Sequence, residues 1–298
     1  MKERMTGFAD EAASSIEGQV AVLKKLSWNS IELRSVDNVL AHELPIDAFN
    51  HVLSVLDKNE IRVSCLGSGI ANWGRAVTEN FDETKEMVNR TITRMKQLDT
   101  HLVRIMSYKI MTLSNGEIAK DQHKEEIFNR LRWICNQFLD NGITPVHENC
   151  FNYGGLSYEH TLEMLYAVPG LRLVFDTGNA PLTVDGRKKF PYPVQNSFEF
   201  YSHVKEYIDH VHIKDSMLDK DGKTEHYFYP GEGDGDVLKI VTSLELHDGY
   251  KGLYSIEPHM EVVFHDTTQQ SNESKRIENF ITYGEKFEQI LHTIHSNR

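Results

Sequence analysis

The chain has 298 residues, 40% of them apolar and 10% aromatic, which is enough for a sizeable core and fits one α/β barrel of typical size. With 44 acidic residues against 32 basic ones, its net charge is −12, and an acidic surface that repels phosphate backbones disfavours nucleic acid as a partner. The three cysteines are odd in number and show no CxxC spacing, which argues against a disulfide framework or a zinc knuckle and favours a reducing compartment.

The amino-terminal segment, residues 1–12, has no apolar stretch behind its charged residues and so does not resemble a signal peptide. No window approaches the roughly 18 apolar residues that a membrane span needs. We therefore expect a cytoplasmic protein without a membrane partner.

Short apolar runs alternate along the chain with longer amphipathic segments. The runs predicted as strands are residues 5–10, 30–36, 62–68, 102–108, 144–149, 171–177, 210–215 and 252–258. Strand and helix patterns in alternation predict a (β/α)8 barrel that spans residues 1–298 as a single domain. The rival architecture, a doubly wound open sheet, usually carries a glycine-rich phosphate turn after its first strand, and the GFADEA segment at residues 7–12 lacks one.

The first amphipathic segment shows helical spacing. Ile16, Val20 and Leu23 recur at i, i+4 and i+7, and Ser14 and Glu17 have the spacing of a capping box ahead of them. The pattern predicts a helix that begins next to Ser14.

Four predicted strands each end in a residue that commonly binds metal ions: Glu148 in PVHEN, Asp176 in LVFDTGN, His212 in HVHIKD and Glu257 in YSIEPH. Strand side chains alternate faces, and the parity of these four lets each face the barrel mouth, where barrel enzymes place their catalytic groups. Because the strands are consecutive, the four side chains are predicted to converge on one metal site. The alternative is four separate solvated strand ends.

Three carboxylates and one imidazole form a mostly oxygen ligand set. That set favours one divalent ion, Mn²⁺ first, with Mg²⁺, Co²⁺ or Zn²⁺ also compatible. Such an ion would polarise the carbonyl and neighbouring hydroxyl of a ketose and stabilise an enediolate, with Glu148 and Glu257 as the acid and base. Epimerisation, isomerisation and dehydration all remain open outcomes of this step.

Several other residues are candidates for substrate binding. Lys214 is predicted either to polarise a substrate oxygen or to form a salt bridge with Asp215 or a neighbouring carboxylate, and His259 either to contact substrate or to cap a strand end. Glu32 and Arg34, at the end of the second predicted strand, would bind polyol hydroxyls or pair with each other.

Two loops also bear on the substrate. Trp73 follows the third predicted strand, where it would stack on a sugar or pack beneath a loop. Residues 229–236, YPGEGDGD, are rich in glycine, but their acidic residues disfavour phosphate, and a turn into the next helix is the stronger interpretation. This favours an unphosphorylated sugar or polyol as the substrate.

The segments PVHEN, FDTGN, HVHIKD and IEPH resemble those of the xylose-isomerase-like barrels, a superfamily of sugar isomerases and epimerases that includes inosose dehydratase and endonuclease IV. In the ketose 3-epimerases of this group the matching residues bind one divalent ion. The resemblance therefore implies a metal site at Glu148, Asp176, His212 and Glu257, a TIM barrel fold and, as in many members, a homo-oligomer.

The resemblance has gaps at positions that contact substrate. Asn179 stands where the epimerases commonly carry a histidine, so we expect Asn179 to contact substrate in its place. Residues 214–218 lack an expected arginine, and residues 152–155 lack an expected glutamate. A dehydratase of the inosose or dehydroshikimate kind is therefore the nearest alternative function. Two further alternatives are a nuclease, which the acidic net charge disfavours, and a barrel that binds a ligand without catalysis.

Overall fold

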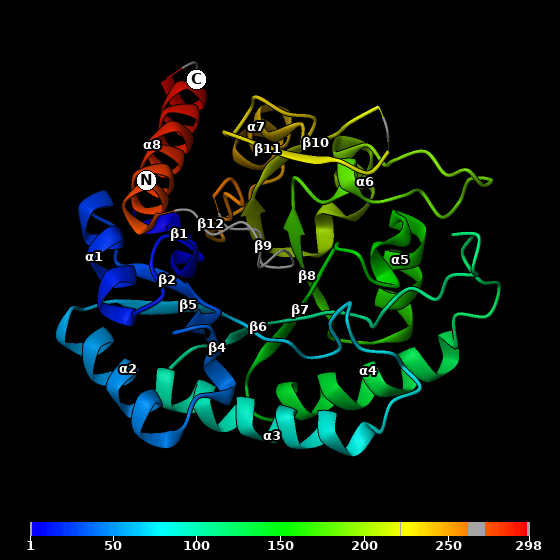
Figure 1. Ribbon diagram of the computed structural model, residues 1–298, viewed down its shortest axis with the longest axis horizontal. Coiled ribbons are helices and arrows are strands. Elements are labelled where there is room, and N and C mark those ends of the chain that lie inside the picture. Colours follow the sequence, from blue (N-terminus) through cyan, green and yellow to red (C-terminus); the bar gives the residue numbers. More distant parts are fainter. Residues whose placement is uncertain (1, 221, 262–271, 297–298) are drawn as a thin grey trace.

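The predicted strands form one barrel, and helices surround it (Figure 1). The computed structural model describes residues 2–220, 222–261 and 272–296. The barrel strands are β1 Met5–Gly7, β2 Ser30–Leu33, β5 Arg62–Gly67, β6 Leu102–Ile105, β7 Thr144–Glu148, β8 Arg172–Asp176, β9 Ile208–Ile213 and β12 Tyr254–Ile256. They run in the order β1-β12-β9-β8-β7-β6-β5-β2, and every pairing is parallel. Within the described residues β1 and β2 share no strand ladder, so the barrel is nearly closed.

One α-helix follows each barrel strand along the chain, which confirms the (β/α)8 prediction. The helices are α1 Ile16–Leu26, α2 Ile46–Lys58, α3 Phe81–Leu98, α4 Lys124–Leu139, α5 Tyr158–Ala167, α6 Ser197–Val204, α7 Val237–Leu246 and α8 Glu273–Ser296. Short 3₁₀ helices cover Lys2–Arg4, Ala9–Glu11, Ala41–Glu43, Gly154–Leu156, Ala180–Leu182 and Lys205–Tyr207. None of the described helices combines the length and the apolar character needed to cross a membrane.

Two antiparallel hairpins interrupt the barrel pattern. One pairs β3 Ser35–Val36 with β4 Val39–Leu40, and the other pairs β10 Asp215–Leu218 with β11 Glu225–Phe228. In both, a single residue separates the first strand of the hairpin from the carboxyl end of a barrel strand, so the hairpins lie at that end of the barrel.

Helix α1 begins one residue later than the sequence pattern predicts. Ser15, not Ser14, is the N-cap, and its hydroxyl accepts a hydrogen bond from the amide of Gly18. The carbonyl of Ser14 instead accepts from the amide of Asp37 and the side chain of Gln19. The Ser14 capping prediction is wrong because a loop from elsewhere in the chain binds that residue outside the helix.

The barrel interior changes from apolar to polar toward the carboxyl ends of the strands. Val146 and Val174 are buried inside with Cys65 and form a small apolar cluster. Two residues further along the same faces lie Glu148 and Asp176, also buried. Side chains two residues apart on these strands therefore face the barrel interior together, as the sequence-based prediction of the site assumes.

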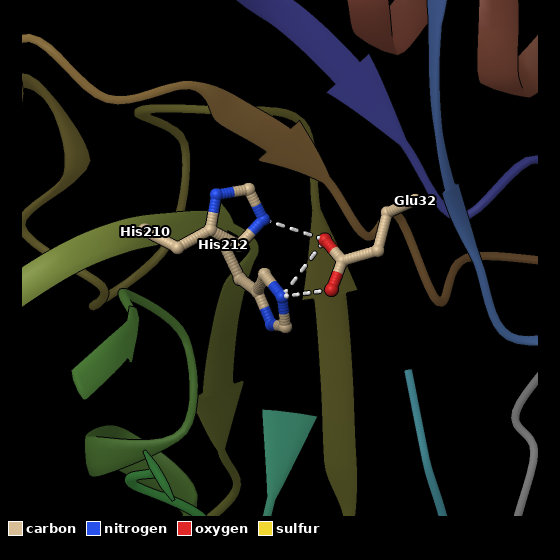
Figure 2. Close-up of side chains that lie close together, drawn as sticks. All are labelled: Glu32, His210 and His212. Atoms are coloured by element: carbon tan, nitrogen blue, oxygen red, sulfur yellow. Dashed lines mark hydrogen bonds and ion pairs between the residues drawn. The ribbon is translucent and has the colours of Figure 1, made fainter. Parts of the chain in front are cut away.

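The polar layer of the interior includes a second buried group, Glu32 with His210 and His212 (Figure 2). Glu32 extends from β2, and both histidines extend from β9. Because His212 also contacts the other acidic residues, this group connects the barrel interior to the site at its mouth.

Candidate metal centre

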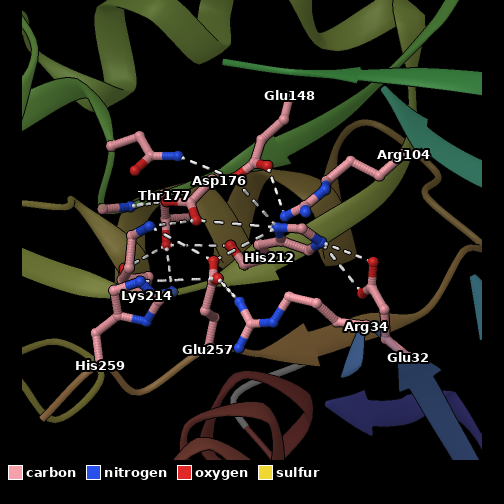
Figure 3. A network of polar contacts seen from close by, with 12 residues as sticks. Glu32, Arg34, Arg104, Glu148, Asp176, Thr177, His212, Lys214, Glu257 and His259 are labelled. Atoms are coloured by element: carbon pink, nitrogen blue, oxygen red, sulfur yellow. Dashed lines mark hydrogen bonds and ion pairs between the residues drawn. The ribbon is translucent and has the colours of Figure 1, made fainter. Parts of the chain in front are cut away.

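The structure brings together the four residues predicted as metal ligands. Glu148 ends β7, Asp176 ends β8, His212 lies near the end of β9, and Glu257 directly follows β12. One ligand atom from each lies within 4.8 Å of the others, and all four side chains are buried. Figure 3 shows Glu148 and Glu257 approaching His212 from two sides.

The spacing of these atoms suits an ion shared between them. His212 Nδ1 lies 3.7 Å from an oxygen of Glu148, 3.9 Å from one of Asp176 and 3.7 Å from one of Glu257. These distances are too long for hydrogen bonds, and Nδ1 has no hydrogen-bond partner among the described residues. Two ligands that each lie about 2.1 Å from one ion are about 3 to 4 Å apart, so this donor set fits one divalent ion.

The electrostatics of the cluster favour bound positive charge. Burial alone would raise the pKa of Glu148, but Arg104 and His212 outweigh it and lower that pKa to about 2. Burial, with help from the neighbouring glutamates, raises the pKa of Asp176 to about 7. Burial would lower the pKa of His212, but the carboxylates of Glu32 and Glu148 raise it to about 10. An ion that binds here would therefore compete with protons on Asp176 and His212.

Glu148 and Glu257, the two glutamates of the cluster, each use one carboxylate oxygen to bind an arginine. Arg104 donates to Glu148 at 3.0 Å, and Arg34 donates to Glu257 at 2.7 Å. In both glutamates the other oxygen is the one that faces His212. The arginines therefore hold the carboxylates in an orientation that directs one oxygen of each toward the cluster.

Lys214 pairs with carboxylates of the cluster, as one of the sequence-based alternatives expects, and not with Asp215. Its ammonium lies 2.9 Å from Asp176 and 3.5 Å from Glu257. The carboxylate of Asp215 instead accepts hydrogen bonds from three glycine amides within residues 231–235. The three glycine amides are therefore already bound to Asp215. The loop leads directly into α7, as expected from the sequence-based interpretation of residues 229–236 as a turn before a helix.

A cavity of about 420 Å³ lies over the cluster. The predicted substrate-binding residues that line it are Arg34, Trp73, Asn179, Lys214 and His259. Two of these are held by acidic side chains: Asn179 donates to Glu148 at 3.1 Å, and the Nδ1 of His259 lies 2.9 Å from Glu11. Trp73 is 41% exposed, so part of its ring is open to solvent at the cavity.

Glu32 lies away from the cavity lining, unlike the other predicted substrate contacts. It is 1% exposed, and its carboxylate contacts His210 and His212. Arg34, its other predicted partner, pairs with Asp10, Glu11 and Glu257. Neither sequence-based role for Glu32 matches this placement.

Arg104, Glu225 and Tyr227 are among the cavity-lining residues that the sequence analysis missed. Arg104 lies within the predicted strand 102–108, where an arginine in an otherwise apolar run was the available signal. Glu225 and Tyr227 extend from β11, and the ring of Tyr227 lies 5.3 Å from that of His259. No local pattern identifies these two, because their position depends on how the β10–β11 hairpin folds over the barrel mouth.

Comparison with known proteins agrees with this architecture. The family model described as "Xylose isomerase-like TIM barrel" matches residues 20–279. A D-tagatose 3-epimerase-like protein superposes with a TM-score of 0.71 at 18% identity, covering 99% of both chains. A xylose isomerase-like TIM barrel protein from Mycobacterium smegmatis, in complex with magnesium, gives 0.68 at 15% identity over 98% of this chain and 97% of that one.

A protein described as a probable dehydratase has a similar fold. The probable 3-DHS dehydratase from Bacillus anthracis gives a TM-score of 0.64 at 15% identity, covering 93% of this chain and 98% of that one. No curated protein matches the sequence. At these identities the solved structures establish the fold of the chain, and its chemistry has to be argued from its own residues.

Proposed function

Because the chain belongs to the xylose isomerase-like TIM barrel family, we propose that it is a divalent-metal-dependent isomerase or epimerase of an unphosphorylated ketose or related polyol. The observation that carries the proposal is the buried cluster in which three carboxylates surround the Nδ1 of His212. Glu148, Asp176, His212 and Glu257 would hold the ion. Mn²⁺ and Mg²⁺ both suit this ligand set. The related structure in complex with magnesium supports a divalent ion of this kind.

The proposed reaction needs a proton acceptor and a proton donor on two sides of the substrate. A bound divalent ion supplies Lewis-acid polarisation of a carbonyl and its neighbouring hydroxyl, which acidifies the C–H bond between them. Glu148 and Glu257 come from β7 and the end of β12, which β8 and β9 separate in the sheet. One carboxylate would remove the proton, and the other would return a proton from the opposite face, which inverts the carbon.

The cavity supplies further contacts for a sugar. The ammonium of Lys214 lies beside the cluster, where it would stabilise negative charge that develops on a substrate oxygen. Trp73 and Tyr227 line the cavity and would cover the apolar face of a sugar ring. The amides of Gly231, Gly233 and Gly235, which could otherwise bind a phosphate group, already donate to Asp215, which supports an unphosphorylated substrate.

A metal-dependent dehydratase is the second candidate, and one observation favours it. His259 lines the cavity, is held by Glu11, and lies close to Glu257. An imidazole in that position would protonate a hydroxyl that leaves from the carbon next to the site of proton removal. The dehydratase with the same fold supports this alternative.

Exchange of a carbon-bound proton with solvent distinguishes the two candidates. We would incubate the Mn²⁺-loaded protein with ketoses, inososes and keto acids in D₂O and follow the products by NMR and mass spectrometry. Deuterium on carbon without loss of water is the expected result, and its position identifies epimerisation or isomerisation. Loss of water would support the dehydratase instead.

Two substitutions test the acid–base pair in the same assay. Glu148→Gln and Glu257→Gln are each expected to abolish deuterium incorporation, because each loses a proposed metal ligand as well as a group that transfers the proton. If no substrate in the panel exchanges with the wild-type protein loaded with Mn²⁺, Mg²⁺ or Co²⁺, or if both variants still exchange, the proposed chemistry is wrong.

A further inference from the structure

One carboxylate joins the candidate metal ligand His212 to a second buried histidine. The Nε2 of His210 lies 2.7 Å from Glu32, and the Nε2 of His212 lies 3.1 Å from both oxygens of Glu32 (Figure 2). His210 and His212 are 0% exposed, and Glu32 is 1% exposed. Along the barrel wall, β12 and β1 separate β9 from β2. The contact between Glu32 on β2 and the histidines on β9 therefore crosses the barrel interior.

This contact decides which nitrogen of His212 is available to an ion. A carboxylate accepts hydrogen bonds, so the proton of a neutral His212 ring lies on Nε2, next to Glu32. The lone pair is then on Nδ1, which faces the oxygens of Glu148, Asp176 and Glu257. The reverse tautomer would leave a buried carboxylate facing a ring nitrogen that has no proton to donate.

His210 completes the arrangement from the other side. Its hydrogen bond restrains the Glu32 carboxylate, and a buried carboxylate without such donors is strongly destabilised. The ring of Phe8 packs edge-on against that of His212, with 5.1 Å between centroids, and further limits its rotation. Glu32 is therefore held in place by His210 and in turn orients His212.

We propose that Glu32 is a positioning residue that, together with His210, sets the tautomer and orientation of His212 and thereby the affinity of the centre for its divalent ion. This inference rests on the proposed metal site. It replaces the expected contact between Glu32 and substrate hydroxyls, since the Glu32 carboxylate faces the two histidines within the barrel interior rather than lining the cavity.

The affinity for Mn²⁺ provides the first test, measured by calorimetric titration of the whole protein. Glu32→Gln is expected to weaken Mn²⁺ binding by about 10-fold to 100-fold, the usual effect of removing a hydrogen-bond partner of a metal-ligating histidine. Glu245→Gln is the matched control. Glu245 is also a buried carboxylate that contacts a histidine, His295. It binds Arg4, which precedes β1, and Tyr254, the first residue of β12, so it lies at the amino-terminal end of the strands, opposite the cluster. The control is expected to keep its affinity for Mn²⁺.

A spectroscopic readout separates positioning from a general loss of stability. In the Co²⁺-loaded wild-type protein, the Nε2 proton of His212 is expected to give a hyperfine-shifted NMR signal that exchanges slowly with solvent, because the proton is buried and bound to Glu32. In Glu32→Gln that signal is expected to broaden or disappear. Glu245→Gln is expected to retain it.

The outcomes distinguish this inference from the proposed function. If the wild-type protein binds no divalent ion, both are overturned. If the wild-type protein binds Mn²⁺ and Glu32→Gln binds it equally well, only the positioning role is wrong. If Glu32→Gln does not fold, His210→Gln takes its place: a severalfold loss of Mn²⁺ affinity is expected, and unchanged affinity overturns the inference.

Discussion

The buried histidines of this chain differ in pKa because their neighbours differ. Burial lowers the pKa of His42 to about 4, and burial also lowers that of His147 to about 4. At His212 burial acts in the same direction, but the carboxylates of Glu32 and Glu148 outweigh it. His42 and His147 are therefore neutral near pH 7, while His212 attracts either a proton or a metal ion.

His42 is expected to make the fold sensitive to acid. Neither of its ring nitrogens has a hydrogen-bond partner among the described residues, and its side chain is fully buried. Between pH 6.5 and about 4 the unfolded chain binds a proton that folded His42 does not, so the free energy of unfolding falls as the pH falls through this window. The loss attributable to His42 is at most about 3 to 4 kcal/mol.

The substitution His42→Leu tests this through urea unfolding at several pH values. The variant is expected to lose less stability than the wild type between pH 6.5 and pH 4. His101→Leu, at a side chain that is 74% exposed, is the control and should follow the wild-type slope. Parallel slopes for His42→Leu and wild type would contradict the prediction.

At the scale of elements, the start of a helix depends on contacts beyond its own sequence. Ser14 and Ser15 are both suitable caps, and the spacing to Glu17 favours Ser14. The amide of Asp37 binds the carbonyl of Ser14, and the helix begins after Ser15. The β10–β11 hairpin is a second example, since no pattern within its strands indicates that Tyr227 lines the cavity.

The two serines provide a matched pair of substitutions. Ser15→Ala is expected to lower the free energy of unfolding by about 1 kcal/mol, because the hydrogen bond from the Gly18 amide is lost. Ser14→Ala should change it by less than about 0.5 kcal/mol, because the contacts of Ser14 use its backbone carbonyl. Chemical denaturation measures both, and the opposite order would show that Ser14 is the cap.

At the scale of the whole molecule, the candidate centre joins strands that are far apart in the chain. Its ligands come from β7, β8, β9 and the end of β12, about half of the barrel. Three buried carboxylates without an ion repel one another, while a bound ion attracts all three. Ion binding should therefore stabilise the barrel as a unit.

The unfolding temperature measures this coupling. Mn²⁺ at 100 times its dissociation constant is expected to add about 2.7 kcal/mol to the stability of the folded protein, and chelation by EDTA should reverse the gain. Glu148→Gln and Glu257→Gln should each lose most of the response. Glu17→Gln, at an exposed carboxylate, should keep it. A wild-type unfolding temperature that does not respond to Mn²⁺, Mg²⁺ or Co²⁺ would contradict the metal site.

The sequence by itself determined the barrel and the four positions of the candidate metal cluster, while the tertiary structure decided what surrounds them. Alternating strand and helix patterns are local, so eight repeats of them predict the fold, and strand parity directs Glu148 and Asp176 to the mouth. The partners of the ligands are not local. Arg34 and Glu257 are 223 positions apart, and Glu32 and His212 are 180 apart. Such pairs depend on the register of strands across the barrel, which no short pattern encodes, so the role of Glu32 became visible only in the folded chain.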